Sequence, residues 1–324
     1  MSCRYLKIED FCSTGSGGTP SRSKPEYYEG GDIPWIKSGD LKDSKIYEAN
    51  EYITAAGLEN SSAKIVEKDS ILIAMYGATV GRLAILGINA ATNQAICNIR
   101  PDTTIADMKY LYYFLKSKFS YFVENAVGGA QPNISQGLIK SLEVPLPSLD
   151  EQKRIADILD KAAGVCQKRE QAIKLADDFL RAKFLEMFGT PANNIHRFPK
   201  GTIRDLVDSV NYGTSAKASI DSGEYPILRM GNITYQGRWD FTDLKYLDLS
   251  VKEKDKYLVK EGDLLFNRTN SKELVGKTAV YEEDRPMAFA GYLIRVRPNS
   301  IGNNYYISGY LNSIHGKITL MNMC

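Results

Sequence analysis

Histidine and cysteine are scarce in this chain, and this limits the chemistry that its side chains could perform. Only two of the 324 residues are histidine, His196 and His315, and neither has a Cys, Asp or His neighbour at metal-ligand spacing. The five cysteines are scattered and never form a Cys-x-x-Cys pair. We therefore expect no disulfide framework, no zinc site and no histidine-based hydrolase, and we predict no catalytic and no metal-binding residues.

A Walker-type phosphate loop and a long apolar run are also missing. No Gly-x-x-x-x-Gly-Lys-Ser/Thr segment occurs, so we expect no ATP-driven motor on this polypeptide. Glu9 and Asp10 stand where an export signal would be apolar. The run from Ile71 to Ala91 is interrupted by Arg82 and by three glycines, which favours strand, loop and strand over a membrane span. We expect a cytoplasmic protein without membrane contact.

Charge of neither sign predominates. The 41 Lys and Arg residues against 39 Asp and Glu residues give a net charge of +2. This is a weak tendency toward anionic partners, far from the strongly basic balance of a protein that coats nucleic acid unaided. If the chain reads DNA, we expect another protein to supply much of the phosphate contact. Hydrophobic and charged fractions of 43% and 25% are typical of a folded globular protein.

Two stretches of the sequence resemble each other at an offset of about 195 residues, far longer than the 20 to 50 residues of a solenoid unit. Aligned pairs along this offset are Gly18 with Gly213, Pro34 with Pro226, Gly39 with Gly231, and Pro101 with Pro298. The long period indicates a duplicated domain. Because 324 residues also exceed the size at which one hydrophobic core usually keeps growing, we expect two globular units.

The first copy mixes strand and helix patterns. Short apolar runs at residues 70–74, 84–86 and 95–99 predict strands. Residues 107–127 carry apolar side chains every three to four positions, which predicts a helix packed on the sheet. The fold class that we predict is α+β, with two similar mixed α/β domains joined by a long helix of the coiled-coil type.

The long helix signature lies between the two copies. Ser148 and Glu151 form a capping box at its start, Pro191 is the first proline after it, and Gly189 stands where a C-terminal glycine cap belongs. Apolar or small side chains recur with a 4,3 spacing that predicts a helix-pairing seam of Leu159, Ala162, Cys166, Ile173, Ala176, Leu180 and Met187. The helix would be roughly 58 Å long at about 1.5 Å per residue. The alternative is a core helix of a larger bundle.

These observations divide the chain into three parts. We predict a first domain at residues 1–147, a spacer helix at residues 148–190 and a second domain at residues 191–324.

Three segments resemble the specificity subunits of type I restriction-modification systems. They are residues 17–21 (Gly-Gly-Thr-Pro-Ser), 128–135 (Gly-Gly-Ala-Gln-Pro-Asn-Ile-Ser) and 144–155, which open the long helix. In that family two target recognition domains each read half of a split DNA site, and two long helices pair as an antiparallel coiled coil that docks methyltransferase subunits. The resemblance implies binding to double-stranded DNA, to methyltransferase (M) subunits and to a restriction/translocase (R) subunit.

The resemblance covers essentially the whole chain, with one departure. The family's second long helix would begin beyond Cys324, where this chain ends. We therefore expect the seam of the first helix to be unpaired and to associate with another copy or with a methyltransferase. The resemblance also implies no cofactor on this chain, and S-adenosylmethionine, ATP and magnesium on the partner subunits.

Candidate DNA contacts in the first copy lie mainly in two polar loops. The loop of residues 17–22 has glycines that permit close backbone approach to phosphate, although a plain turn between strands explains them equally well. The loop of residues 76–82 lies between apolar strands and matches residues 267–272 of the second copy. The predicted contacts are Gly17, Gly18, Thr19, Ser21, Arg22, Lys37, Ser38, Lys42, Tyr76, Thr79 and Arg82.

The second copy carries different side chains at the matching positions, as two domains that read different half-sites should. The predicted contacts there are Tyr212, Thr214, Ser215, Lys217, Arg229, Arg268, Asn270 and Ser271. Arg82 and Arg268 could pair with guanine and Asn270 with adenine. For either arginine, phosphate contact or simple surface charge is the alternative.

Some expectations concern residues outside these loops. We expect Trp35 to lie in the core, and Gln131 and Asn133 to brace the junction with the helix.

Two other functions stay open at this stage. One is the specificity subunit of another restriction class with catalysis on a separate chain. The other is a self-sufficient metal-dependent nuclease that uses Asp102 and Glu151.

Overall fold

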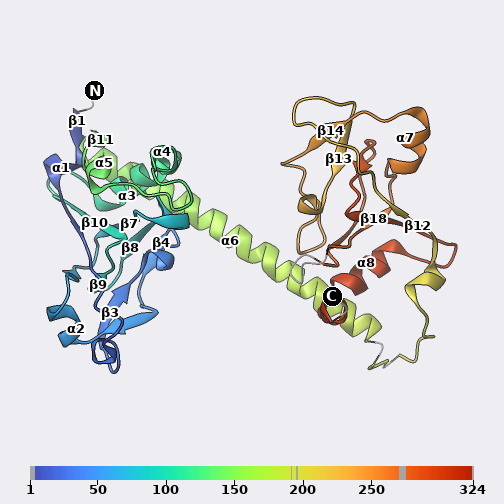
Figure 1. Cartoon of the computed structure of the whole chain (residues 1–324), viewed down its shortest axis with the longest axis horizontal. Helices are drawn as coiled ribbons and strands as arrows, with labels where there is room; N and C mark the ends of the chain where they lie inside the picture. The colour runs from blue at the N-terminus through green and yellow to red at the C-terminus, as the bar shows by residue number, and fades with distance from the viewer. Residues whose placement is uncertain (1–3, 191, 195, 270–274, 323–324) are drawn as a thin grey trace. The chain divides into compact units, whose positions relative to one another are not determined.

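The computed structural model describes residues 4–190, 192–194, 196–269 and 275–322 (Figure 1). The chain forms two compact units, Met1–Gln167 (unit 1) and Lys168–Cys324 (unit 2), and the boundary between them falls inside one helix. Within the described ranges, none of the helices combines the length and the apolar character that crossing a membrane requires.

Unit 1 is built on a five-stranded sheet. Its strands, in spatial order, are β2 (Cys12–Ser16), β10 (Ile96–Pro101), β7 (Ile71–Ala74), β8 (Leu83–Leu86) and β4 (Ser44–Ile46). The three strands predicted from apolar runs are confirmed as β7, β8 and β10. All four residues of β7 are buried because side chains on both faces of the strand enter hydrophobic clusters.

A second sheet in unit 1 has four strands. They are, in order, β5 (Glu51–Ile53), β3 (Ile33–Ile36), β9 (Ala90–Thr92) and β6 (Ile65–Val66). β3 pairs with β9 in parallel and with β5 antiparallel. Trp35 on β3 is 1% exposed and its indole Nε1 donates to the Gly18 carbonyl at 3.0 Å, so its predicted place in the core is confirmed.

Two helices cover unit 1's larger sheet where one was predicted. α3 (Met108–Ser117) and α4 (Phe119–Glu124) follow each other with a break at Lys118. The Asp107 carboxylate caps α3 by accepting from the Tyr110 amide at 3.0 Å. Leu111 and Leu115 are buried against the sheet, which confirms the apolar stripe.

The remaining elements of unit 1 are short. β1 (Arg4–Lys7) pairs antiparallel with β11 (Glu143–Leu146). The others are α1 (Ile8–Phe11), η1 (Pro25–Tyr27), η2 (Ser38–Asp40), α2 (Ala55–Glu59), η3 (Gly77–Thr79) and α5 (Gln136–Lys140).

Unit 2 repeats the topology of unit 1. Its strands β12 (Val207–Tyr212), β18 (Leu293–Pro298), β15 (Leu264–Asn267) and β16 (Thr278–Val280) have the order of β2, β10, β7 and β8. Likewise β14 (Lys245–Leu247), β13 (Tyr225–Leu228) and β17 (Ala288–Phe289) match β5, β3 and β9, and β13 and β17 are again parallel. The helical elements are η4 (Ile203–Leu206), η5 (Met230–Asn232), α7 (Val251–Tyr257), α8 (Asn304–Asn312) and α9 (Ile314–Met321). The duplication inferred from the sequence is therefore present in the fold.

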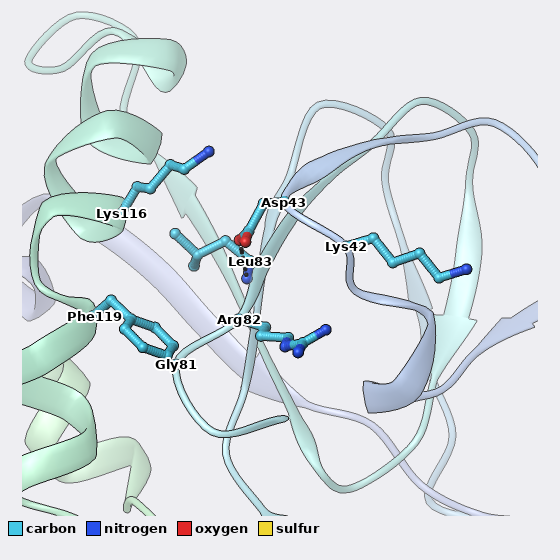
Figure 2. Close-up of a pocket in the computed structure, with 7 residues that line it drawn as sticks. All are labelled: Lys42, Asp43, Gly81, Arg82, Leu83, Lys116 and Phe119. Carbon is cyan, nitrogen blue, oxygen red and sulfur yellow. Dashed lines mark hydrogen bonds between the residues drawn. The ribbon is translucent and has the colours of Figure 1, made fainter. Parts of the chain in front are cut away.

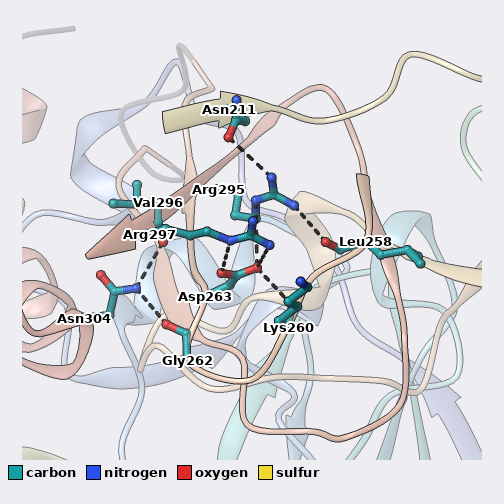
Figure 3. Close-up of polar contacts among 9 residues, drawn as sticks. All are labelled: Asn211, Leu258, Lys260, Gly262, Asp263, Arg295, Val296, Arg297 and Asn304. Carbon is teal, nitrogen blue, oxygen red and sulfur yellow. Dashed lines mark hydrogen bonds and ion pairs between the residues drawn. The ribbon is translucent and has the colours of Figure 1, made fainter. Parts of the chain in front are cut away.

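A buried ion-pair network joins three segments of unit 2 (Figure 3). The Asp263 carboxylate accepts from Arg297 at 2.8 and 3.1 Å. Nε of Arg295 lies 3.8 Å from Oδ2 of the same carboxylate. Arg295 also donates to the Leu258 carbonyl at 2.7 Å, which ties the segment before β15 to β18. The matching position in unit 1 is Ser70, so the two copies use the same frame with different buried chemistry.

The long helix α6 spans Leu149–Phe188 and has 40 residues, so the predicted long helix between the two domains is confirmed. The Ser148 hydroxyl accepts from the Glu151 amide at 3.4 Å, but the reciprocal half of the predicted capping box is wrong. The Glu151 carboxylate instead binds Arg154 at 2.8 Å, one turn further on, because a bidentate guanidinium partner lies within reach. Gly189 has φ +66° and its amide donates to the Leu185 carbonyl, as expected of a C-terminal cap.

Gln152 anchors the start of α6 in unit 1. Its side chain is fully buried, and its amide oxygen accepts from the Asp107 amide at 2.9 Å. Its amide nitrogen donates to the carbonyls of Ile105 and Pro147 at 3.1 and 2.9 Å. One side chain therefore joins the helix, the chain before it and the turn that precedes α3.

In unit 2 the last turns of α6 pack on α8. The rings of Phe184 and Phe188 lie 5.6 and 4.9 Å from that of Tyr306. Arg238 donates to the Asp177 carboxylate at 2.5 Å. The helix is thus held within each unit by contacts of its own.

We predict that Gln152→Leu lowers the free energy of unfolding of unit 1 by about 1–3 kcal/mol, because the buried Asp107 amide loses its acceptor. Urea unfolding in a Trp239→Phe background measures this, since Trp35 is then the only tryptophan left and lies in unit 1. Gln171→Leu, at an exposed position of the same helix, is the control and should change little. Equal effects of the two variants would contradict the anchoring role.

Candidate nucleic-acid interface

Three backbone hydrogen bonds bring the candidate loops of unit 1 together at residues 92–95, which we call the connector segment. The Gly18 amide donates to the Thr92 carbonyl at 2.9 Å, and the Asn93 amide donates to the Ile36 carbonyl at 3.0 Å. The Met75 amide donates to the Ala95 carbonyl at 2.7 Å. The loop after β2, the end of β3 and the loop after β7 therefore meet at one place.

The loops of unit 2 are joined in the same way, by backbone hydrogen bonds to its own connector segment, residues 289–292. The Thr214 amide donates to the Phe289 carbonyl at 2.9 Å, and the Ala290 amide donates to the Leu228 carbonyl at 2.9 Å. The Arg268 amide donates to the Tyr292 carbonyl at 3.2 Å. Each unit thus presents three loops on one shared backbone frame.

The glycines of the first loop serve close packing. Gly17 and Gly18 are buried, and a Cβ at Gly17 would lie 1.8 Å from the Thr92 carbonyl oxygen. In unit 2 a Cβ at Gly213 would lie 2.3 Å from the carbonyl oxygen of Ala290. Gly17 and Gly18 therefore lie in a closely packed turn between strands, which was the alternative explanation for them. Thr19, which is exposed and hydrogen-bonded to Gln94, stays a predicted DNA contact.

Arg22 and Lys37 are both bound to one carboxylate, that of Glu51 on β5. Arg22 donates to it at 2.6 Å, and Lys37 pairs with its other oxygen. Hydrogen bonds from Lys37 and then Arg22 hold the pKa of Glu51 below its usual value. The Arg22 guanidinium also lies 4.4 Å from the centre of the Tyr28 ring. These two predicted contacts are thus held in place and partly neutralised by the protein itself.

The second loop of unit 1 is more exposed. Tyr76 is 46% exposed, and the Thr79 hydroxyl donates to the Tyr76 carbonyl at 3.0 Å. Gln131 and Asn133 line a shallow pocket of about 340 Å³ together with Tyr76 and Gly77. The prediction that they brace the junction with the helix is wrong, because Gln152 does this while residues 131–133 pair with the loop of Tyr76. They belong to the candidate interface.

Lys42 and Arg82 are exposed and form no ion pair with any carboxylate in the described part of the chain. Ser21 donates to or accepts from Ser23 at 2.8 Å, and Ser38 is half-buried at the start of η2. Unit 1 thus offers free cations beside the second loop and neutralised ones beside the first.

In unit 2 some of the predicted residues are exposed, and others are buried or bound to neighbouring side chains. Arg268 stacks on exposed Tyr212, with its guanidinium carbon 5.0 Å from the ring centre. Arg229 pairs with Asp243 at 2.8 Å, and Thr214 is buried. Ser215 and Lys217 are exposed, whereas Asn270 and Ser271 lie outside the described residues.

Two connector residues were missed from the sequence. Gln94 is exposed between the two loops of unit 1, and Tyr292, in the connector segment of unit 2, is 59% exposed. An amide can pair with adenine, and a tyrosine offers both an aromatic face and a hydroxyl. No local pattern marks them, because their exposure depends on which loops the connector segment joins.

The predicted seam of α6 is exposed along its length. Ile173, Leu180 and Met187 are each more than half exposed, Leu159 somewhat less, and Ala162, Cys166 and Ala176 are exposed as well. Ile158 and Val165 extend the same apolar stripe. The packing face of α6 toward each unit is adjacent to this stripe and leaves it uncovered by the described residues.

The carboxylates considered for a nuclease are occupied locally. Asp102 accepts from the amide and hydroxyl of Thr104 at 2.9 and 2.7 Å, and Glu151 binds Arg154. Each therefore has a structural role in its own turn.

The fold and the paired loops define a duplicated α+β protein with two polar loop clusters on similar frames. A model of the type I restriction modification DNA specificity domain matches residues 4–175 and 198–321, which together make up most of the chain. The protein belongs to this family.

Several similar proteins are specificity subunits of type I restriction enzymes. The specificity subunit of the type I restriction enzyme EcoR124I/EcoR124II from Escherichia coli is 33% identical over 150 residues, covering 45% of this chain and 37% of that protein. The MjaIX specificity subunit of Methanocaldococcus jannaschii is 33% identical over 187 residues, covering 56% and 42%. The EcoKI specificity subunit of Escherichia coli K12 is 24% identical over 314 residues, covering 90% and 67%. The matches thus span about two fifths of the first two relatives and two thirds of the third.

Solved structures show the same fold. The S subunit of a type I restriction-modification system from M. genitalium superposes with a TM-score of 0.56 at 15% identity, covering 99% of this chain and 80% of that one. A chain from a study of complex assembly in the type I R-M system gives a TM-score of 0.52 at 17% identity, covering 98% and 82%.

We predict that Glu51→Gln destabilises unit 1 in a pH-dependent way. Because the folded-state pKa of Glu51 is lowered, its contribution is complete above the unfolded-state pKa of about 4.3 and is lost as the pH falls through the folded value. The stability difference from wild type should reach at most about 1 kcal/mol near neutral pH, as for an exposed ion pair, and vanish in acid. Urea unfolding followed by Trp35 fluorescence in the Trp239→Phe background measures it. Glu59→Gln, which removes an exposed carboxylate, is the control and should show no such trend.

Proposed function

We propose that this protein is a non-catalytic DNA-recognition subunit of a type I restriction-modification complex. Each unit would bind one half of a bipartite target in double-stranded DNA, and α6 would set the spacing of the two halves. The observation that carries the proposal is the pair of loop clusters, which share a backbone frame but differ in side chains. On this frame unit 1 carries Tyr76, Thr79 and Gln94, and unit 2 carries Tyr212, Arg268 and Tyr292.

Such an arrangement suits sequence recognition. A conserved frame fixes where side chains meet the grooves of the duplex, and exchange of the side chains changes the bases preferred. The weak net charge of +2 supports the need for further contacts from partners. Those partners would be methyltransferase and restriction/translocase subunits, which would use S-adenosylmethionine, ATP and magnesium.

The methylome of cells that express this protein with its methyltransferase tests the proposal. We expect a split methylation motif. Replacing residues 1–147 by the corresponding domain of a relative should change one half of the motif, and replacing residues 195–324 should change the other. Lys68→Ala, at an exposed position beyond the opposite end of β7 from the second loop, should leave both halves unchanged. Methylation that is unaffected by both exchanges would rule the proposal out.

The exposed seam of α6 would be a protein interface in this complex. Its apolar side chains follow the 4,3 spacing of helix pairing, and the described residues do not cover them. We propose that it pairs with the same seam of a second copy or with a helix of the methyltransferase.

We predict that the chain is larger than its 36.1 kDa monomer mass by light scattering at micromolar concentration. Ile173→Glu combined with Leu180→Glu should give a monomer and weaken retention of the methyltransferase, because both changes put charge into the seam. Leu175→Glu is the matched control, since Leu175 is 70% exposed but lies off the stripe. A wild-type protein that stays a uniform monomer and binds methyltransferase as tightly as the double variant would contradict this interface.

A further inference from the structure

A basic pocket in unit 1 lies next to the second candidate loop (Figure 2). Its volume is about 430 Å³, and it lies where the start of β8, the chain after η2 and the end of α3 come together. Each of these segments supplies one cation, namely Arg82, Lys42 and Lys116. In Figure 2, Lys116 extends from the helix side, whereas Lys42 and Arg82 lie on the strand side with their ends directed away from Lys116.

The three cations are free of carboxylate partners in the described ranges. All three side chains are exposed, and the Lys116 ammonium lies 5.9 Å from the centre of the Tyr112 ring on its own helix. Some other cations of unit 1 are paired with carboxylates, such as Lys109 with Asp160. The charge of the pocket is therefore available to an external anion.

Asp43 is the one carboxylate that lines this pocket, and it has a structural role. Its side chain accepts from the Leu83 amide at 3.1 Å, and its own amide donates to the Leu83 carbonyl at 2.8 Å. The Tyr112 hydroxyl donates to the Asp43 carbonyl at 2.9 Å. These bonds fasten the chain that carries Lys42 to the strand that follows Arg82 and hold the two cations on the same side of the pocket.

The floor of the pocket is set by a glycine. Gly81 has φ +80°, and a Cβ there would lie 3.2 Å from the Phe119 ring and 3.3 Å from Phe122. The close contact brings α4 against the loop and leaves the ring of Phe119 beside Arg82. An apolar floor below a cationic rim suits a phosphate group that is attached to a sugar.

Unit 2 has the same backbone at this place but different side-chain contacts. Gly276 takes the position of Gly81, with φ +72° and Leu320 packed against it. Lys277 takes the position of Arg82 but is 6% exposed, with its ammonium bound to the Ile233 carbonyl. Asn312, in the place of Lys116, donates to the Thr278 carbonyl at 2.7 Å. The cationic groups that unit 1 exposes are thus buried or replaced in unit 2.

We propose that the Lys42–Arg82–Lys116 pocket binds one backbone phosphate of the DNA duplex, and that this contact belongs to unit 1 alone. The proposal rests on the proposed function. Arginine and lysine are the usual phosphate ligands, and a phosphate contact positions a protein on the duplex without reading its sequence. Arg82 then helps to position unit 1 on the duplex and adds to its affinity. Base selection in unit 1 depends instead on the neighbouring residues Tyr76, Thr79 and Gln94.

Binding of the full chain to a short fluorescent duplex of random sequence tests this, measured over a series of salt concentrations. Arg82→Ala and Lys116→Ala should each weaken binding several-fold. The triple variant with Lys42→Ala should lower the slope of log affinity against log salt by about one, the loss of one phosphate contact. Lys68→Ala is the matched control, because this exposed lysine lies at the opposite end of β7. Trp35 fluorescence checks that each variant is folded.

The methylation motif gives a second readout. The pocket variants should lower methylation at all sites alike and leave the motif unchanged, whereas a base-reading role for Arg82 would alter one half of it and overturn the proposal. Variants that bind duplex as Lys68→Ala does would overturn it as well, while leaving the proposed function intact if wild type still directs a split motif. A wild-type protein that directs no methylation and binds no duplex would defeat both. Inorganic phosphate that abolishes the difference between wild type and Lys116→Ala, at an ionic strength where chloride does not, would assign the pocket to free phosphate and overturn the duplex contact.

Discussion

In each unit the whole candidate interface depends on one close backbone approach. Gly17 and Gly18 pass so near to Thr92 and Ser62 that no side chain fits between them. This approach lets the strand of the larger sheet lie against the connector segment of the smaller one, and three loops converge there as a result. Gly213 repeats the arrangement in unit 2. Loops held on such a frame can vary in side chain while their backbone positions stay the same.

The long helix depends on polar anchoring at one end and aromatic packing toward the other. Gln152 satisfies three backbone groups in unit 1. Phe184 and Phe188 pack against Tyr306 in unit 2. Each contact fixes the direction in which the helix leaves its unit, because a buried side chain with several partners allows one orientation. The apolar seam on the neighbouring face is not covered by the residues that the structure describes.

The two units differ most in how they place their charge. Unit 1 neutralises Arg22 and Lys37 with Glu51 and leaves cations free at the pocket beside Arg82. Unit 2 buries Asp263 with two arginines. A common ancestor fold can accommodate both, because buried ion pairs and exposed cations are set by single side chains and leave the sheet unchanged. The two similar domains therefore expose different charged groups beside their loops.

Much of the architecture could be predicted from the sequence. The long repeat period indicated two similar domains, the apolar runs located β7, β8 and β10, and the glycine at position 189 marked the end of α6. These features are local, so their signals lie in the order of nearby residues. The resemblance to specificity subunits was carried by short motifs of the same kind.

The site could be predicted only in outline. The sequence marked the polar loops, but the pairing of Arg22 with Glu51, the exposure of Gln94 and the burial of Lys277 could not be read from it. Each of these depends on which distant strands become neighbours. Sequence order by itself determined the repeated elements and the helix between them, because periodicity is local. Tertiary structure alone decided which cations are free and which side chains face outward, because charge pairing and burial depend on contacts between segments that are far apart in the chain.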